Sequence, residues 1–204
     1  LTLATTPKCG IDIHYLKYAT KGGADEPTAA TGAMIVPTGT DPACTGPRPM
    51  VLYAHGTTTS RGYNIADITD PNNAAAGELG LIAAMFAAQG YIVVAPNYAG
   101  YDTSPLTYHP YLNAKQQAGE MIDSLKAARK ALPNVPAGVQ VSDNGKLFVT
   151  GYSEGGHVAM ATMKAMQEQK MTVTAGAPLS GPYAMAMFGD AVFGGNVNVG
   201  GTVF

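Results

Sequence analysis

The feature that most constrains the fold is the pentapeptide Gly151-Tyr152-Ser153-Glu154-Gly155, a G-x-S-x-G pattern. The apolar stretch KLFVT precedes it, and the helix-like stretch HVAMATMKAMQ follows it. Between a strand and a helix, this pattern predicts a sharp turn that exposes the serine hydroxyl above a sheet. Glycine at both ends permits the strained backbone and the close approach of strand and helix. The sequence therefore predicts Ser153 as a nucleophile, and the alternative is an ordinary glycine-rich turn.

Apolar strands alternate with helices along most of the chain. We expect an antiparallel hairpin, followed by four further strands and three helices. The expected strands are residues 11–20, 30–37, 49–54, 91–95, 146–150 and 171–178, and the expected helices are residues 81–89, 114–132 and 157–170. The alternation predicts an α/β fold with a mostly parallel sheet and helices on both faces. The long polar stretch 58–80 is expected to run over the surface.

A nucleophile that transfers acyl groups needs hydrogen-bond donors for the oxyanion that forms. One expected donor is the backbone N–H of Glu154, the residue after Ser153. The second is expected from the loop His55-Gly56-Thr57, which follows the strand at 49–54. Gly56 lets this loop turn and brings the N–H of Thr57 to the site. We interpret the His55 side chain as structural, bonding the loop backbone.

With these residues assigned, the chain resembles the α/β-hydrolase superfamily, in particular its secreted lipase and carboxylesterase members. The matching pieces are YAHGT (53–57), APNYAGYDTS (95–104), HPYL (109–112) and TGYSEGG (150–156). The resemblance implies an esterase or lipase that cleaves small-molecule or lipid esters. It also implies a triad of serine, acid and histidine that works without a cofactor or metal.

The chain departs from this family in the rest of the triad, whose order is serine, acid, histidine. After Ser153 the only histidine is His157 and the only aspartate is Asp190. We reject His157 as the base because it lies in the first turn of the helix after Ser153. His109 is interpreted as a surface or loop-packing residue, with a place beside the substrate as the alternative. Asp102 is interpreted as shaping its loop.

The missing base and acid lead to an expectation about domain organisation. Residues 1–180 are expected to be the N-terminal portion of one α/β-hydrolase domain, and residues 181–204 the start of a cap or lid insertion. The triad acid and histidine are expected on a companion polypeptide segment, together with the remaining strands. The stretch YAMAMF (183–188) suits an apolar acyl pocket or cap, or plain core packing.

The cysteines, the net charge and the apolar runs indicate the compartment and the partners of the protein. Cys9 and Cys44 flank the expected hairpin, whose open end brings them together. A disulfide there predicts a secreted or periplasmic protein, and two unrelated thiols are the alternative. The formal net charge of −2 and the lack of a Lys/Arg run argue against a nucleic-acid partner. The longest apolar run, residues 81–88, is too short to span a bilayer.

Two other functions stay open at this point. A non-catalytic binding module that kept the fold would explain the missing histidine. A serine peptidase or acyltransferase would use the same elbow, because a fold does not fix its function.

Overall fold

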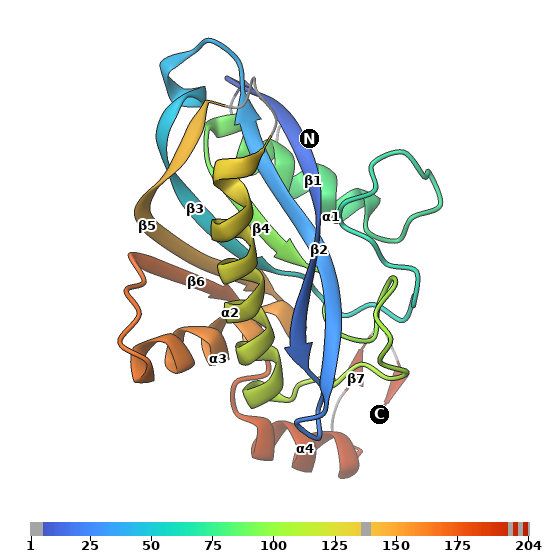
Figure 1. Cartoon of the computed structure of the whole chain (residues 1–204). Coiled ribbons are helices and arrows are strands. Elements are labelled where there is room, and N and C mark those ends of the chain that lie inside the picture. Colours follow the sequence, from blue (N-terminus) through green and yellow to red (C-terminus); the bar gives the residue numbers. More distant parts are fainter. Residues whose placement is uncertain (1–5, 136–139, 196–197, 200–201, 204) are drawn as a thin grey trace.

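A six-stranded sheet organises the molecule. The computed structural model describes residues 6–135, 140–195, 198–199 and 202–203, and the sheet has the strand order β1-β2-β4-β3-β5-β6 (Figure 1). The strands are β1 (Gly10–Lys21), β2 (Pro27–Thr38), β3 (Gly46–Ala54), β4 (Ile92–Pro96), β5 (Val141–Tyr152) and β6 (Ala175–Leu179). The β1–β2 and β2–β4 pairs are antiparallel, and the pairs among β4, β3, β5 and β6 are parallel. The predicted fold class is therefore confirmed.

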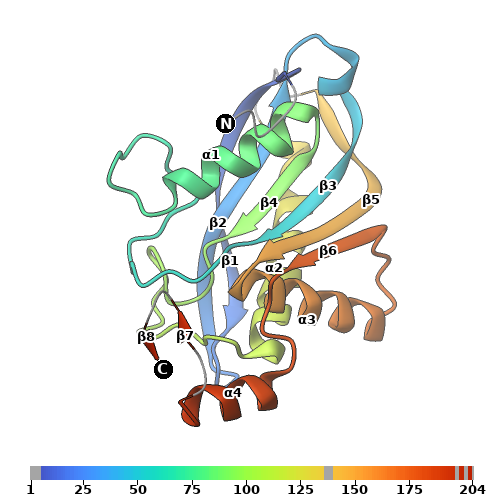
Figure 2. The same cartoon turned by 180° about the vertical axis from the view of Figure 1, so that it is seen from behind.

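Helices cover both faces of this sheet. The helices α2 (Ala114–Ala131) and α3 (Glu154–Glu168) lie on one face, and α1 (Ala76–Met85) lies on the other (Figures 1 and 2). A fourth helix, α4 (Met185–Phe193), follows β6. Short 3-10 turns occur at Pro42–Cys44, Ala87–Gln89 and Leu132–Asn134, and the short strands β7 (Asn198–Val199) and β8 (Thr202–Val203) pair with each other. No helix in the described part of the chain is long and apolar enough to cross a membrane.

The core lies along the central strands. All five residues of β4 are buried, as are the last five of β3, because helices cover both sides of these strands. Their side chains read as continuous apolar runs rather than as alternating patterns. Helix α2 contributes a buried face at helical spacing, which includes Met121, Ile122 and Leu125.

The first helix differs from the expected 81–89. It begins at Ala76 and ends at Met85, because Phe86 leaves the helical conformation, and Gly90 (φ 94°) closes the turn that follows. The start of the helix lies inside the stretch 58–80 that we expected on the surface. That expectation is wrong in part, since Tyr63 and Ile65 are buried within this stretch.

The elements around Ser153 also begin and end at other residues than expected. Helix α3 starts at Glu154 rather than at residue 157, so Ser153 alone separates it from β5. The last strand is shorter than the expected 171–178. Residues 169–171 complete the end of α3 instead, with Lys170 at φ 57° and the Met171 N–H donating to Met166 O at 2.8 Å.

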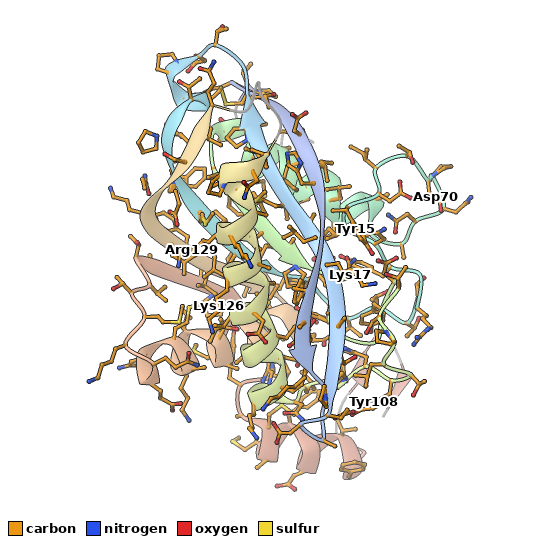
Figure 3. The ribbon with its side chains drawn as sticks, in the orientation of Figure 1. Tyr15, Lys17, Asp70, Tyr108, Lys126 and Arg129 are labelled. Carbon is orange, nitrogen blue, oxygen red and sulfur yellow. A yellow bond between two sulfur atoms is a disulfide. The ribbon has the colours of Figure 1, made fainter. Side chains whose placement is uncertain are left out.

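The β1–β2 hairpin is fastened at both ends. The expected disulfide joins Cys9 and Cys44 at its open end. At the turn, the Tyr108 hydroxyl donates to Glu26 Oε1 at 2.5 Å, and Figure 3 shows Tyr108 beside this turn. Lys115 of α2 donates to Asp25 Oδ2 at 2.8 Å. The hairpin is thereby fixed to the helix layer and to the loop before α2.

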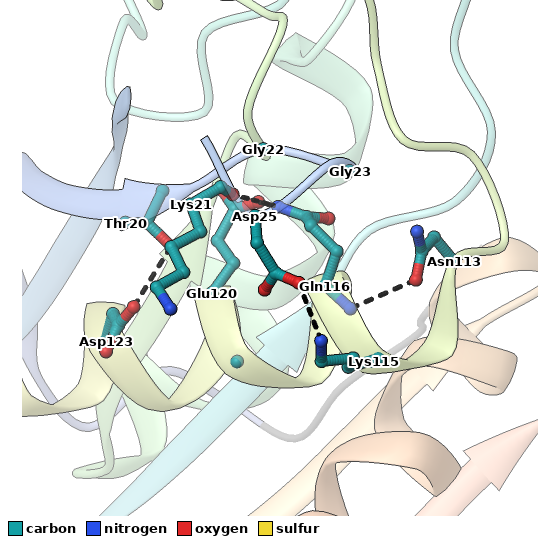
Figure 4. Close-up of a pocket in the computed structure, with 11 residues that line it drawn as sticks. Thr20, Lys21, Gly22, Gly23, Asp25, Asn113, Lys115, Gln116, Glu120 and Asp123 are labelled. Carbon is teal, nitrogen blue, oxygen red and sulfur yellow. Dashed lines mark hydrogen bonds and ion pairs between the residues drawn. The ribbon is translucent and has the colours of Figure 1, made fainter. Parts of the chain in front are cut away.

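A polar hollow of about 200 Å³ lies between the hairpin turn and α2 (Figure 4). Its residues bond one another: the Thr20 hydroxyl donates to the Asp123 carboxylate at 3.0 Å, and Gln116 Nε2 donates to the backbone carbonyl of Lys21 at 2.9 Å. Farther along α2, Arg129 donates to Asp143 of β5 at 2.9 Å. These contacts identify the hollow as a structural junction between the hairpin and α2.

Candidate active site

Ser153 occupies a strained turn between β5 and α3. Its backbone has φ 58° and ψ −121°, a conformation that costs a non-glycine residue about 1–3 kcal/mol. Neighbouring elements hold it there: the Ser153 N–H donates to Leu179 O at 3.0 Å, and the Gly156 N–H donates to Ser153 O at 2.9 Å. Strain of this kind, fixed by the surrounding structure, is typical of a nucleophile elbow.

The glycines of the pentapeptide lie where backbones meet. A Cβ added to Gly151 would lie 2.5 Å from Ala54 O, and one added to Gly155 would collide with the same carbonyl. Helix α3 therefore approaches the end of β3 at a distance that leaves no room for a side chain. This approach brings the residues after β3 to Ser153.

The loop His55-Gly56-Thr57 lies beside Ser153. A Cβ on Gly56 would lie 3.4 Å from Tyr152 O and 4.0 Å from Ser153 Cβ. The Thr57 N–H has no acceptor among the described residues, while Thr57 Oγ1 bonds the Tyr111 hydroxyl at 2.9 Å. Glu154 is the first residue of α3, where N–H groups lack an intrahelical acceptor. Thr57 lines the same hollow as Ser153, and Glu154 directly follows the serine, so the oxyanion hole stays a prediction.

A hollow of about 430 Å³ opens over this place. Its size lies within the range of small-molecule sites. The lining residues come from the ends of β3 and β5 and from α1: Tyr53, Gly56, Thr57, Gly77, Glu78, Leu81, Tyr152 and Ser153. The hollow joins the predicted nucleophile and the predicted loop in one space.

Glu78 of α1 is a residue of this hollow that the sequence analysis missed. It accepts hydrogen bonds from the hydroxyls of Tyr53 at 2.6 Å and Tyr63 at 3.1 Å, and from the Gly56 N–H at 3.2 Å. Burial, and after it the charge of Glu78, raise the pKa of both tyrosines, so both hydroxyls remain donors. Glu78 therefore anchors the loop beside Ser153, and no motif along the chain marks it.

His55 has the structural contacts expected of it. Its ring nitrogens lie 2.7 Å from Gly56 O and 3.0 Å from Asn97 O. The ring lies between those of Tyr63 and Tyr98, with centroids 4.3 and 4.0 Å away. Burial lowers the pKa of His55, which favours the neutral ring.

His109 contacts the residue that follows Ser153. Its Nε2 lies 2.7 Å from Glu154 Oε1, and its Nδ1 lies 3.0 Å from Ala99 O. Gln117 of α2 donates to the same Glu154 oxygen at 2.7 Å. His109 thus packs its loop, as interpreted, and is not among the residues that line the hollow. Its partner Glu154 could not be found from sequence spacing, because 45 residues separate the two.

The other triad candidates have recorded partners or positions that do not involve the serine hydroxyl. His157 Nδ1 lies 3.3 Å from Pro182 O, and Asp190 is part of α4. Asp102 accepts from the hydroxyls of Tyr15 and Thr31 at 2.6 and 2.7 Å, which fits a loop-shaping role. Among the described residues, no histidine bonds the Ser153 hydroxyl.

The mostly parallel sheet, with a strained serine between β5 and α3, defines an α/β-hydrolase. Residues 78–199 match the sequence model of the prolyl oligopeptidase family. The chain belongs to that family. No curated protein matches the chain.

Two solved proteins extend the comparison. The rice cell wall degrading esterase LipA from Xanthomonas oryzae, in a ligand-bound form, is 34% identical with a TM-score of 0.80 over 93% of this chain. A protein from Legionella pneumophila, provisionally named a hydrolase, is 27% identical with a TM-score of 0.71 over 87% of this chain. The chain spans 47% and 45% of these proteins, about half of their length.

Proposed function

We propose that this chain carries the nucleophile and the oxyanion hole of a serine carboxylic-ester hydrolase. The observation that carries the proposal is the strained backbone of Ser153 beside Gly56, in a hollow that Thr57 also lines. The similarity to hydrolases, LipA among them, supports hydrolysis as the reaction class.

The proposed chemistry is acyl transfer through Ser153. Its Oγ attacks the ester carbonyl carbon while a histidine base takes the hydroxyl proton. The carbonyl oxygen becomes an oxyanion that accepts hydrogen bonds from the Thr57 and Glu154 N–H groups. The alcohol then leaves with the proton, and water releases the acid from Ser153 by the reverse route. No step in this scheme calls for a cofactor or a metal.

We propose that the histidine and its acid partner come from a companion polypeptide segment. The exposure of β6 supports this proposal. β6 is an edge strand of the sheet, and most of its residues are exposed, so a further strand could pair with it. Beside it an apolar hollow of about 300 Å³ is lined by Met85, Phe86, Tyr91 and Phe148, among others. Further strands that pair with β6 would cover this face and bring new loops to Ser153.

Residues 1–180 would then be the N-terminal portion of one domain, and residues 181–204 the start of a cap. Helix α4 supports the cap, because it has no buried residue and exposes Met187 (74%) and Phe193 (94%). This exposure disfavours plain core packing for the stretch 183–188. The rest of the proposed cap, at 196–197, 200–201 and 204, lies outside the described residues.

The proposed substrates are small-molecule or lipid esters, and the proposed location is secreted or periplasmic. The Cys9–Cys44 disulfide supports this location, since disulfides persist in oxidising compartments. The LipA similarity makes esters of plant cell walls one class to assay.

The experiment that tests the proposal is covalent labelling of the complete enzyme with a fluorophosphonate, which reacts with activated serines. We expect one label on Ser153, and none in Ser153→Ala. We also expect short-chain aryl ester turnover to fall by at least about 10⁴-fold in this variant. Absence of labelling in the folded wild type would favour the non-catalytic binding module.

A serine peptidase is the second candidate, because the family model that matches the chain is that of prolyl oligopeptidases. The same enzyme preparation would separate the two functions. Faster turnover of aryl esters than of matched peptide amides supports the esterase, and the reverse order supports the peptidase.

A further inference from the structure

The Glu154 side chain points into the protein core, although its backbone is next to the proposed nucleophile. The side chain is fully buried, with 0% of its surface exposed. Burying a carboxylate costs folding free energy unless charged or polar groups form hydrogen bonds with it. The residues that bond the Glu154 carboxylate therefore decide whether it can stay buried at this position.

Two residues from other elements supply the compensation. His109 Nε2 lies 2.7 Å from Glu154 Oε1, and Gln117 Nε2 donates to the same oxygen at 2.7 Å. The second carboxylate oxygen, Oε2, has no partner in the part of the chain that the structure describes. His109 and Gln117 thus provide the recorded hydrogen bonds that offset the burial of this charge.

His109 is itself held in one orientation. Its ring stacks on Tyr98 with centroids 5.4 Å apart and an angle of 12°, and it packs on Tyr101 at 4.7 Å. Its Nδ1 lies 3.0 Å from Ala99 O, and its Nε2 lies 2.7 Å from Glu154 Oε1 and 3.4 Å from Gln117 Nε2. A proton on Nε2 makes a charge-assisted hydrogen bond to the Glu154 carboxylate.

We propose that His109 and Gln117 are positioning residues that act through Glu154 on the oxyanion hole. They fix the first residue of α3, whose N–H would bind the oxyanion, and His109 offsets a negative charge that would otherwise oppose the oxyanion. This inference rests on the proposed function.

The mechanism makes a charge-specific prediction. An unpaired carboxylate near the site repels the negatively charged intermediate more strongly than it affects the neutral ester. Replacing His109, and with it the hydrogen bond to Glu154, should therefore lower kcat and leave KM nearly unchanged. Removing the Glu154 charge in the same molecule should restore much of the loss.

The test compares His109→Gln, Glu154→Gln and the double variant in the complete enzyme. We expect His109→Gln to lower kcat by about 10- to 100-fold, in line with small displacements of catalytic groups. We expect Glu154→Gln to lower it only a few-fold, and the double variant to recover to within a few-fold of Glu154→Gln. The proposal fails if His109→Gln keeps full kcat, or if the double variant is no better than His109→Gln.

Thr162→Val is the matched control for stability. Thr162 is buried in α3 and donates to Val158 O at 2.7 Å, away from the elbow. We expect it to lower Tm and leave kcat within about two-fold, because a buried hydrogen bond contributes to stability in general. A loss of kcat in Thr162→Val as large as in His109→Gln would mean that loss of stability alone explains the effect.

Gln117→Met covers the case in which His109→Gln does not fold. It removes one of the two donors while His109 stays, and we expect kcat to fall by up to about 10-fold. Unchanged kcat in this variant would count against the proposal. Ser153→Ala distinguishes a failure of the proposed function from a failure of the positioning role. Full activity in Ser153→Ala would refute the proposed function itself.

Discussion

At the scale of single residues, the turn between β5 and α3 combines a strained Ser153 with glycines that have no room for a side chain. Gly155 faces the carbonyls of Ala54 and His55 across the α3–β3 contact. We predict that Gly155→Ala destabilises the protein by about 3 kcal/mol or more, because backbone atoms must move apart. Urea unfolding measures the change.

Gly119 provides the control for that prediction. It also lies in a helix, α2, but nothing lies within 4 Å of an added Cβ. Gly119→Ala should stabilise the protein by about 0.5–1 kcal/mol through helix propensity. Equal effects of the two substitutions would contradict our account of the elbow.

The oxyanion-binding role that we propose for Thr57 belongs to its backbone N–H. We predict that Thr57→Pro, which removes the N–H, lowers kcat by about 10²–10³-fold. Thr57→Ala keeps the amide and loses only the bond to the Tyr111 hydroxyl, so its loss should be much smaller. Steady-state kinetics of aryl ester hydrolysis compares the two. A similar loss in both variants would place the role in the side chain instead.

Residue-level prediction of backbone structure from sequence succeeded where a local motif determines it. The spacing around Ser153 gave a turn between a strand and a helix, because those constraints act within a few residues. Glu78 and the His109–Glu154 contact were out of reach, since the paired groups come from distant parts of the chain. Such contacts depend on how elements pack, which local spacing does not encode.

At the scale of elements, the disulfide closes the β1–β2 hairpin. Cys9 and Cys44 are 35 residues apart, and the link restricts the unfolded chain. By loop entropy, replacing both with serine should cost about 2–4 kcal/mol. Thermal unfolding of the double variant, compared with the oxidised and reduced wild type, measures this. A Tm equal to that of the oxidised protein would show that the link contributes nothing.

The hairpin turn gives a pH prediction. The Lys115 ammonium, first through its hydrogen bond and then through its charge, lowers the pKa of Asp25. The pKa of Asp25 in the folded protein lies below its unfolded value near 3.8. The Asp25–Lys115 pair therefore stabilises the fold above pH 3.8, and this stabilisation is lost as pH falls through the folded pKa.

Lys115→Met should raise the Asp25 pKa toward its usual value, which an NMR titration of the carboxyl measures. High salt should do the same in the wild type, because screening weakens exposed pairs. A pKa unaffected by either change would show that Lys115 does not act on Asp25.

The order and type of the main elements followed from the sequence, whereas several ends did not. Helical apolar periodicity identified α2, and continuous apolar runs identified the strands that are buried on both faces. The ends at Phe86 and Lys170 depend on backbone conformations at single residues. Helix α4 lies in a stretch with no firm period, and its exposed apolar residues gave no pattern to detect.

At the scale of the whole molecule, the apolar face near β6 predicts self-association of the 204-residue chain. Ala175 and Ala177 of this edge strand are exposed beside the hollow lined by Phe148. We predict that Ala177→Lys reduces self-association, because a charge on an edge strand opposes pairing. Sedimentation velocity at increasing concentration measures it.

Ala19→Lys is the matched control, since Ala19 is exposed on β1 at the opposite edge. It should leave self-association unchanged. A chain that stays monomeric at all concentrations would contradict the predicted role of the β6 face.

The two edges of the sheet differ in one further respect. The exposed positions of β1 include the charges of Asp12, Lys17 and Lys21, whereas β6 carries none. A chain in which only the β6 edge is free of charges pairs with a copy of itself about a two-fold axis. This pairing occupies the β6 edge of both copies. Growth into a fibre needs two such edges on every copy, so association through β6 would stop at a closed dimer.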